Sequence, residues 1–424
     1  MSPVMKILLL GSGGREHALF WKLSQSPRAG EIRVYPGNGG FPNSSLVSDD
    51  SLDLSRSESV KEHVRKEKYD LVVIGPEQPL VDGVADALQG ICPVFGPVAQ
   101  AAQLEGSKQF AKSFMEKYGI PTAASRSFTE TAPALEYLKT RAAPYVIKAD
   151  GLAAGKGVTV AATLEEAEKA VRECLDEGAF GESGRSLLVE DFLKGEEASV
   201  FALCDGERAL PFIAAQDHKR AHDGDQGPNT DGMGAYCPAP LVTPEIMARV
   251  QSEVLDPVMR GMKEEGSPYR GLLYAGLMID GDRPSVVEFN VRFGDPETQA
   301  LLRLLDEDLV ELMLLCAEGS LPDRALKFSP GSSIVVVLAA EGYPGSYTKN
   351  IEIKGLDKLK GDIICFHAGT KKERDLILSS GGRVLGITAV GSDLKAAREA
   401  AYQGIKNVGA DHVFYRKDIG VRAI

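Results

Sequence analysis

Short apolar runs that end at glycine or proline are the feature that most limits the fold of this chain. Such runs occupy residues 6–10, 69–74 and 92–95, and a further strand candidate at 31–35 follows an amphipathic stretch at 15–25. A strand that is apolar along its whole length is buried on both faces, and its alternation with helices is typical of a parallel sheet with right-handed crossovers. Residues 1–105 therefore predict an α/β domain.

The remaining sequence predicts further domains, because 424 residues are too many for a single core. Ser107 is placed to cap a helix. Further elements are expected at 145–148, 164–177 and 187–190, and then at 334–338, 383–390 and 392–405. We expect four blocks: 1–105, 106–195, 196–330 and 331–424.

The charge balance excludes some classes of partner. The chain has 60 acidic and 48 basic side chains, a net charge of −12. A surface this acidic does not attract nucleic acid or anionic membranes, so anionic substrates must be held by local basic clusters. Glycine is abundant, at 45 residues, and many glycines fall at the ends of predicted strands.

The cysteines and the N-terminal residues indicate a cytoplasmic protein. Six cysteines lie far apart, without a Cys-x-x-Cys pair, which is typical of buried thiols in a reducing compartment rather than of disulfides or a zinc site. The apolar run before Gly11 is too short for a signal peptide or a membrane anchor.

Residues 11–17, with the sequence GSGGREH, follow the first predicted strand and open a helix. Glycines let backbone N–H groups approach an anion at the positive end of a helix dipole. The turn resembles a dinucleotide fingerprint, but Glu16 stands where its last glycine is expected, and no acidic residue follows the second strand. Phosphate binding and a purely structural turn both remain open, and a nicotinamide cofactor is not favoured.

Two further loops follow predicted strands. The loop at 75–83 carries Glu77 and two prolines, and either binds a sugar or amine or is only a rigid connection. The loop at 148–158 combines several glycines with Lys148 and Lys156, although its spacing is not that of a P-loop. Backbone amides and ammonium groups form a good cradle for phosphate oxygens, so a flap over phosphates is favoured over a plain hairpin.

The segment 287–298 is the most informative in the chain. Because side chains alternate along a strand, Glu288, Asn290 and Arg292 share one face. Carboxylate and amide oxygens are ligands suited to Mg²⁺ held between protein and phosphates, and an arginine beside them can pair with a carboxylate or a phosphoryl group. This order of residues predicts a metal site.

Two other segments carry weaker signals. The connector at 189–197 offers backbone groups and apolar contact to a purine, although acidic strand ends are common. The polar stretch at 216–240 is long enough to be a lid, a binding loop or a disordered segment, and Lys219 and Arg220 in it could stabilise phosphate charge. His218 has no evident partner in the sequence and receives no catalytic role.

Taken in order, these motifs resemble those of the glycinamide ribonucleotide synthetases of the ATP-grasp superfamily. The resemblance spans the chain and rests on segments 11–17, 75–77, 105–108, 148–157, 216–219, 288–297 and 415–420. It implies an N-terminal domain like that of biotin carboxylase, a central ATP-grasp pair of α+β subdomains (the first carrying the glycine-rich flap, the second the metal site) and a small C-terminal domain. It also implies ligation of glycine to 5-phosphoribosylamine through glycyl phosphate, with ATP consumed, as a step of de novo purine synthesis.

The resemblance also implies a role for each matching residue. ATP is expected to contact Lys108, Lys148, Gly155, Lys156, Gly157, Glu190, Phe192, Leu193 and Glu197. Mg²⁺ or Mn²⁺ is expected on Glu288 and Asn290, with Arg292, Asp217 and Lys219 as the catalytic residues. The substrates are expected on Gly13, Gly14, Arg15, Glu77, Pro79, Asp295 and Glu297.

Other functions remain to be distinguished. A second ATP-grasp ligase with another carboxylate or amine would share the nucleotide and metal motifs. An NAD-dependent oxidoreductase built on the first glycine turn, and a nucleotide-binding regulatory module without catalysis, belong to different classes. The resemblance further implies a monomer or weak dimer with transient contact to neighbouring enzymes of the purine pathway.

Overall fold

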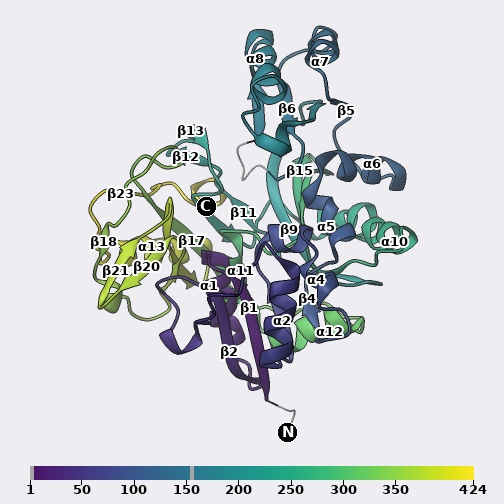
Figure 1. Ribbon diagram of the computed structural model, residues 1–424. Coiled ribbons are helices and arrows are strands. Elements are labelled where there is room, and N and C mark those ends of the chain that lie inside the picture. The colour runs from purple at the N-terminus through teal and green to yellow at the C-terminus, as the bar shows by residue number, and fades with distance from the viewer. Residues whose placement is uncertain (1–3, 153–156) are drawn as a thin grey trace.

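In the computed structural model, which describes residues 4–152 and 157–424, the predicted N-terminal parallel sheet is present (Figure 1). Its order is β2 (Ala29–Pro36), β1 (Met5–Gly11), β3 (Leu71–Ile74) and β4 (Val94–Phe95), with parallel pairing throughout. The side chains of β1 from Ile7 to Leu10 are fully buried, as expected for a strand covered on both faces. The helices of this part are α1 (Gly14–Leu23), α2 (Ser57–Glu67), α3 (Glu77–Val81), α4 (Val84–Ala87) and α5 (Ala99–Gly106).

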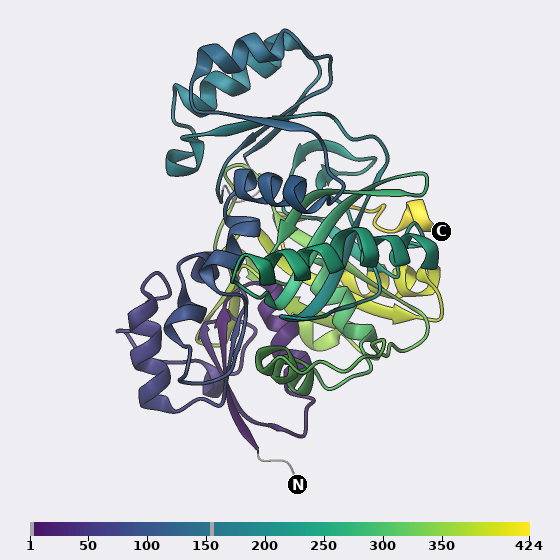
Figure 2. The same cartoon turned by 90° about the vertical axis from the view of Figure 1, so that its right-hand side faces the viewer.

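A small lobe stands apart from the rest of the molecule and is seen at the top of Figures 1 and 2. Its antiparallel sheet has the order β5 (Ser125–Phe128), β8 (Leu187–Glu190), β6 (Tyr145–Ala149) and β7 (Val158–Ala161). Helices α7 (Thr131–Leu138) and α8 (Leu164–Leu175) pack on the sheet and form a separate hydrophobic core with it. Helix α6 (Lys108–Tyr118) leads into the lobe, and the Ser107 hydroxyl caps it by accepting the Phe110 N–H, as predicted.

The central sheet is antiparallel and carries the predicted metal-binding segment at one end. Its order is β10 (Ala209–Pro211), β9 (Glu196–Asp205), β15 (Arg270–Asp280) and β16 (Arg283–Asn290). The accompanying helices are α9 (Pro244–Val250), a π-helical turn (Gln251–Leu255), α10 (Asp256–Glu264), α11 (Glu297–Leu304) and α12 (Leu309–Glu318). Because β16 ends at Asn290, Arg292 lies just beyond the strand rather than on it.

The polar stretch at 216–240, for which a lid, a binding loop or a disordered segment was expected, forms four short strands. These are β11 (Gln216–Asp217), β12 (Arg220–His222), β13 (Gln226–Asn229) and β14 (Gly234–Cys237). Strands β12 and β13 pair as a hairpin, whereas β14 pairs with a strand of the C-terminal sheet. Strand β14 therefore takes part of its hydrogen bonds from residues about a hundred positions later in the chain.

The C-terminal sheet has six strands and is built from two distant parts of the sequence. Its order is β11, β14, β17 (Ser332–Ala340), β22 (Arg383–Gly391) and β19 (Ile364–His367), and β23 (Val413–Phe414) also pairs with β17. Helix α13 (Leu394–Ile405) covers it, and a small sheet of β18 (Glu352–Ile353), β21 (Leu376–Ser379) and β20 (Thr370–Glu373) lies beside it. In space, the third and fourth predicted blocks thus share a sheet.

Shared hydrophobic cores join the N-terminal, central and C-terminal parts. One core combines the N-terminal domain with β9, β15 and β16, and a second combines it with α11, α12 and Val335 of β17. Among the helices in the described residues, none is long and apolar enough to cross a membrane.

Two histidines meet where α1 packs against the C-terminal sheet. His17 Nδ1 accepts the backbone N–H of His367 at 2.8 Å, and the two rings lie 5.4 Å apart. Burial, together with the neighbouring His367, lowers the pKa of His17 to about 3, and burial lowers the pKa of His367 to about 4. The folded protein therefore holds both rings neutral.

This pair predicts a loss of stability in mild acid. Below pH 6.5, the ordinary pKa of histidine, the unfolded chain takes up protons that the folded protein does not. The contribution of the pair to the free energy of unfolding is fully present above that pH. It falls by about 1.4 kcal/mol per pH unit for each histidine as the pH drops towards the folded pKa values.

The measurement is urea unfolding of the wild type, His17→Asn and the exposed control His222→Asn between pH 7.5 and 5. We expect the pH slope to be shallower only in His17→Asn, which keeps an acceptor but cannot titrate. Equal slopes in all three proteins would contradict this account of the pair.

Candidate functional site

A large cavity of about 740 Å³ lies where the N-terminal domain, the small lobe and the central sheet meet. Most residues predicted for the site line it: Gly13, Arg15, Glu77, Lys108, Lys148, Gly157, Glu190, Phe192, Leu193, Glu197, Asp217, Lys219, Glu288, Asn290, Arg292, Asp295 and Glu297. Gly14 lines a neighbouring cavity instead, and Pro79 lines neither because it is buried in α3. Gly155 and Lys156 lie outside the described residues.

One end of the large cavity combines a buried carboxylate with apolar walls. Glu190, at the end of β8, forms ion pairs through Oε2 with Lys148 (3.0 Å) and Lys112 (3.2 Å). Its Oε1 is also buried but has no hydrogen-bond partner among the described residues. Phe192, exposed by 43%, and Leu193 line the same cavity. Because an unpaired buried oxygen is costly, this end is suited to a flat ligand with a hydrogen-bond donor.

Lysines lie around a second carboxylate of the cavity, Glu288. The Lys108 ammonium donates to the Gly151 carbonyl at 2.8 Å, and burial, followed by the charge of other groups including Lys148, shifts the pKa of Lys108 downward. Although burial opposes ionisation of Glu288, the surrounding positive charges, Lys219 foremost, lower its pKa. The structure thus holds an ionised carboxylate among cations, an arrangement that can bind a metal ion and phosphate oxygens together.

Arg292 forms a buried cluster with two carboxylates from the N-terminal part of the chain. Its guanidinium lies 3.0 Å from Glu105 and 3.2 Å from Glu77, and it donates to Asn290 Oδ1 at 3.2 Å. Glu105 also accepts the Val291 N–H at 2.7 Å. These contacts fix the Arg292 side chain next to Asn290, as the alternating pattern predicted.

The two carboxylates of this cluster differ in their protonation. Burial, only partly offset by Arg292, raises the pKa of Glu105 to about 7. For Glu77, burial is outweighed by the charges of Arg292 and Arg15, which lower its pKa to about 2. Since the two acids repel each other, a single guanidinium favours the ionisation of one of them, Glu77.

A third charged group lies around Lys219. Its ammonium is 2.5 Å from Glu197 Oε2, and the charges of Glu197 and Asp217 outweigh burial and raise its pKa. Burial and the neighbouring acids raise the pKa of Asp217 to about 7, while Lys219 and Arg422 counteract them. Asp217 can therefore gain or lose a proton near neutral pH, which is the property expected of a group that exchanges protons with an amine.

The first glycine turn is largely occupied by the protein itself. Glu16 accepts the Gly13 N–H at 2.6 Å and the Arg15 Nε–H at 2.5 Å, and the Arg15 backbone N–H donates to Asp295. A Cβ at Gly75 would lie only 2.2 Å from Glu16 Oε1, so the glycine there makes room for this carboxylate. Two of the amides predicted to bind phosphate are thus already paired with carboxylates.

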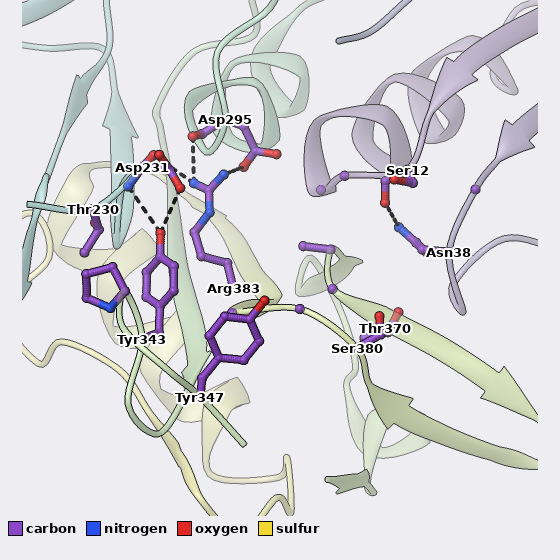
Figure 3. Close-up of a pocket in the computed structure, with 18 of the residues that line it drawn as sticks. Ser12, Asn38, Thr230, Asp231, Asp295, Tyr343, Tyr347, Thr370, Ser380 and Arg383 are labelled. Carbon is purple, nitrogen blue, oxygen red and sulfur yellow. Dashed lines mark hydrogen bonds and ion pairs between the residues drawn. The ribbon is translucent and has the colours of Figure 1, made fainter. Parts of the chain in front are cut away.

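A second cavity of about 520 Å³ lies between this turn and the C-terminal domain (Figure 3). Arg383 pairs with Asp295 at 3.2 Å and donates to the Asp231 carbonyl at 2.9 Å, and the Tyr343 hydroxyl donates to the Asp231 carboxylate at 3.1 Å. Both cavities are lined by Ser12, Gly13, Asn229, Thr230, Asp231, Asp295 and Arg383. They therefore adjoin along the β1–α1 turn and the segment after β13.

Several residues of the site were not predicted from the sequence. Glu105 belonged to a recognised motif but had no assigned role, and its position just before the capping Ser107 was the available signal. Asp231 lies in the polar stretch at 216–240 but had no assigned role. Tyr343 and Arg383 carried no such signal, and Arg383 is brought to the cavity by the pairing of β22 with β17.

Comparison with known families covers nearly the whole chain. The models of the phosphoribosylglycinamide synthetase N domain, ATP-grasp (A) domain and C domain match residues 5–105, 106–298 and 333–422. The chain is 49% identical to a phosphoribosylamine–glycine ligase of Leptospira interrogans, with 100% of both chains covered. It is also 49% identical to that of Rhizobium meliloti, with 99% of each covered.

Solved structures show the same architecture. The crystal structure of phosphoribosylamine–glycine ligase from Thermotoga maritima superposes with a TM-score of 0.86 at 33% identity, covering 98% of this chain and 100% of the other. The biotin carboxylase domain of the Hydrogenobacter thermophilus 2-oxoglutarate carboxylase superposes with a TM-score of 0.73 at 16% identity, covering 98% and 92%. This second likeness shows the fold alone.

The Arg292 cluster predicts a large effect on stability. Arg292→Met leaves Glu77 and Glu105 buried without their cation, and we expect a loss of about 3–5 kcal/mol in the free energy of unfolding at pH 8. The loss should shrink in mild acid, where protonation removes the repulsion between the two acids.

Urea unfolding measures this loss, with Arg283→Met at an exposed position of β16 as the control. Adding Glu105→Gln to Arg292→Met should restore part of the stability, since glutamine can still accept the Val291 N–H. A loss no greater than that of the control would contradict the cluster's role.

Proposed function

Because the chain belongs to the phosphoribosylglycinamide synthetase family, we propose that it joins glycine to 5-phosphoribosylamine with ATP, giving glycinamide ribonucleotide, ADP and phosphate. The observation that carries this proposal is the large cavity, where lysines, an unpaired buried acceptor, Glu288 with Asn290, and Arg292 come together. A phosphorylated nucleotide and a carboxylate need these groups within reach of one another.

The small-lobe end of the cavity fits the adenosine of ATP. The unpaired Oε1 of Glu190 can accept the adenine amino group, with Phe192 and Leu193 as apolar contacts and Glu197 near the ribose. The phosphates then extend towards Lys108 and Lys148. Gly157 lines this path, and Gly155 and Lys156, outside the described residues, complete the predicted flap.

Glu288 and Asn290 fit a divalent cation, which we propose to be Mg²⁺ or Mn²⁺. Among the described residues, no group of three or more His, Cys, Asp or Glu side chains could hold a metal ion. A site with one carboxylate and one amide suits an ion that is bound mainly through substrate phosphates and water. When bound, such an ion would neutralise part of the negative charge on the phosphates.

The chain's own charges fit the activation of a carboxylate. A carboxylate oxygen of glycine attacks the γ-phosphorus of ATP, the bond to ADP breaks, and glycyl phosphate forms. Arg292 and Lys219 stabilise the charge that develops during this transfer. The amine of the second substrate then attacks the carbonyl carbon, phosphate leaves, and Asp217 receives the proton released from nitrogen.

The second cavity fits 5-phosphoribosylamine. Ser12, Gly13 and Gly14 line it beside the N-terminus of α1, and Asp295 borders both cavities. The sugar amine can thereby point into the large cavity, where Arg15, Glu77 and Glu297 lie. Pro79 makes no contact in this arrangement, because it is buried within α3.

The alternatives lead to different outcomes. Another ATP-grasp ligase would use the same nucleotide groups with a different amine or carboxylate. A dinucleotide on the first glycine turn is not favoured, because Glu16 fills the space beside Gly11 and Gly75. A regulatory module would bind ATP without turnover. Cytoplasmic location and a monomer or weak dimer stay predictions.

The proposed reaction predicts that ADP formation needs all three substrates. In a coupled assay, omission of glycine or of 5-phosphoribosylamine should abolish ADP release, because the acyl phosphate is formed from one and consumed by the other. ADP release with a different amine and no 5-phosphoribosylamine would favour the alternative ligase, and saturable ATP binding without turnover would favour the regulatory module.

The metal assignment predicts a specific defect in Glu288→Gln. Loss of the carboxylate charge should raise the Mg²⁺ concentration needed for half-maximal activity by about tenfold or more, measured at a temperature at which the variant stays folded. The control is Glu264→Gln, at an exposed position on α10. Unchanged activity of Glu288→Gln at limiting Mg²⁺ would remove Glu288 from the metal site.

A further inference from the structure

The last residues of the chain lie against the segment that carries Asp217 and Lys219. Figure 1 shows the C-terminus close to β11, and Arg422 donates from Nη2 to the Asp217 carbonyl at 2.6 Å. We call residues 415–424 the C-terminal segment and residues 216–237 the hairpin segment. The resemblance noted above includes residues 415–420, but the proposed chemistry gives them no role.

Arg416 is the centre of this contact and is almost completely buried, with 1% exposed. Its Nε and Nη2 donate to the two oxygens of Asp418 at 2.8 and 2.7 Å. Its Nη1 donates to Asp225 Oδ1 at 2.8 Å and to the Arg220 carbonyl at 3.0 Å. One guanidinium thus links the C-terminal segment to both ends of the β12–β13 turn region.

Backbone groups extend the contact along the hairpin segment. The Lys417 N–H donates to Asp223 at 2.7 Å, and the Gly420 N–H donates to His218 Nε2 at 3.1 Å. In the other direction, the Gly224 N–H donates to Asp418 at 2.8 Å. These bonds, with that of Arg422, run from position 217 to position 225.

The C-terminal segment is itself held from behind by α13. The Tyr402 hydroxyl donates to the Arg416 carbonyl at 2.6 Å and accepts the Ile419 N–H at 3.2 Å. Arg398 donates from Nε to the Ile419 carbonyl at 3.1 Å, and the Ile419 side chain is fully buried. The segment is therefore a rigid support and not a loose tail.

The hairpin segment needs such a support. Strand β11 has only two residues, which pair with Tyr236 and Ala235, and so short a strand fixes little of the neighbouring backbone. The Lys219 side chain is tied to Glu197 alone among the described ion pairs. We propose that Arg416 and Arg422 are positioning residues that hold Asp217 and Lys219 in the geometry required for ligation, an inference that rests on the proposed function.

The chemistry of the two arginines differs, and this difference gives the test. Arg416 uses a planar fork with donors to four oxygen atoms on three residues, which the single ammonium of lysine cannot reproduce. Arg422 donates to the Asp217 backbone carbonyl and also interacts with the Tyr236 hydroxyl, and the ammonium of a lysine can replace the donation to the carbonyl. Lysine should therefore rescue position 422 but not position 416.

The experiment compares Arg422→Ala, Arg422→Lys, Arg416→Ala and Arg416→Lys by steady-state kinetics and thermal unfolding. We expect Arg422→Ala to lower kcat by about tenfold with little change in the KM for ATP, because the misplaced groups act during transfer. Arg422→Lys should recover most of this loss of kcat. Arg416→Lys, in contrast, should have a kcat as low as that of Arg416→Ala.

The matched control is Arg303→Ala, which removes the donations from Arg303 to Thr388 and to the Asp362 carbonyl, away from the hairpin segment. It should leave kcat unchanged. An Arg422→Ala enzyme with wild-type kcat would overturn the inference. It would also be overturned if Arg422→Ala lowered both kcat and the unfolding temperature and Arg422→Lys restored neither.

A second readout does not depend on turnover. Hydrogen exchange of the amides at 217–220 should be faster in Arg422→Ala than in the wild type and in Arg303→Ala. If the wild type itself lacks ligase activity, the proposed function fails. Hydrogen exchange then still tests whether the C-terminal segment holds the hairpin segment in place. If the wild type is active and neither kcat nor exchange changes in Arg422→Ala, the inference alone fails.

Discussion

The ion cluster of Arg292 with Glu77 and Glu105 is the contact on which the site depends. It joins the start of α3, the end of α5 and the residues just after β16. Charges buried to this degree are stable only when they remain paired, so the N-terminal domain and the central sheet must meet in one arrangement. In that arrangement, Asn290 and Glu288 line the cavity together with residues at the carboxyl ends of the parallel strands.

The acidic composition acquires a specific meaning in this setting. Although the chain carries −12 overall, the lysines of the cavity lie next to the carboxylates of Glu190, Glu197 and Glu288. Without a ligand, these acids offset the repulsion among buried ammonium groups. An incoming polyphosphate can then interact with positive charge that is already in position, and little reorganisation is required.

The sequence alone predicted those features that depend on local patterns. Apolar runs ending in glycine gave the parallel sheet, and alternation along a strand grouped Glu288, Asn290 and Arg292 correctly, even though the strand ends at Asn290. Each signal lies within a few residues of the feature it specifies, so no tertiary knowledge was required. The resemblance to a known family then placed most of these residues in one site.

The features that were missed depend on contacts between distant residues. The segment at 216–240 has no clear period because its strands are only two to four residues long, and one of them, β14, pairs with the distant strand β17. Arg383 reaches Asp295 across 88 positions, and nothing near either residue indicates the pairing. Similarly, Glu16 interrupts the dinucleotide pattern in the sequence, but only the fold shows that it fills the space between Gly11 and Gly75.

The central claim is that ATP activates the glycine carboxylate by phosphorylation within this one cavity. The most direct measurement uses glycine labelled with ¹⁸O in its carboxylate, followed by mass analysis of the inorganic phosphate released. If glycyl phosphate forms, the attacking oxygen leaves with phosphorus, so each phosphate should carry one labelled oxygen. Unlabelled phosphate from a productive reaction would contradict the account.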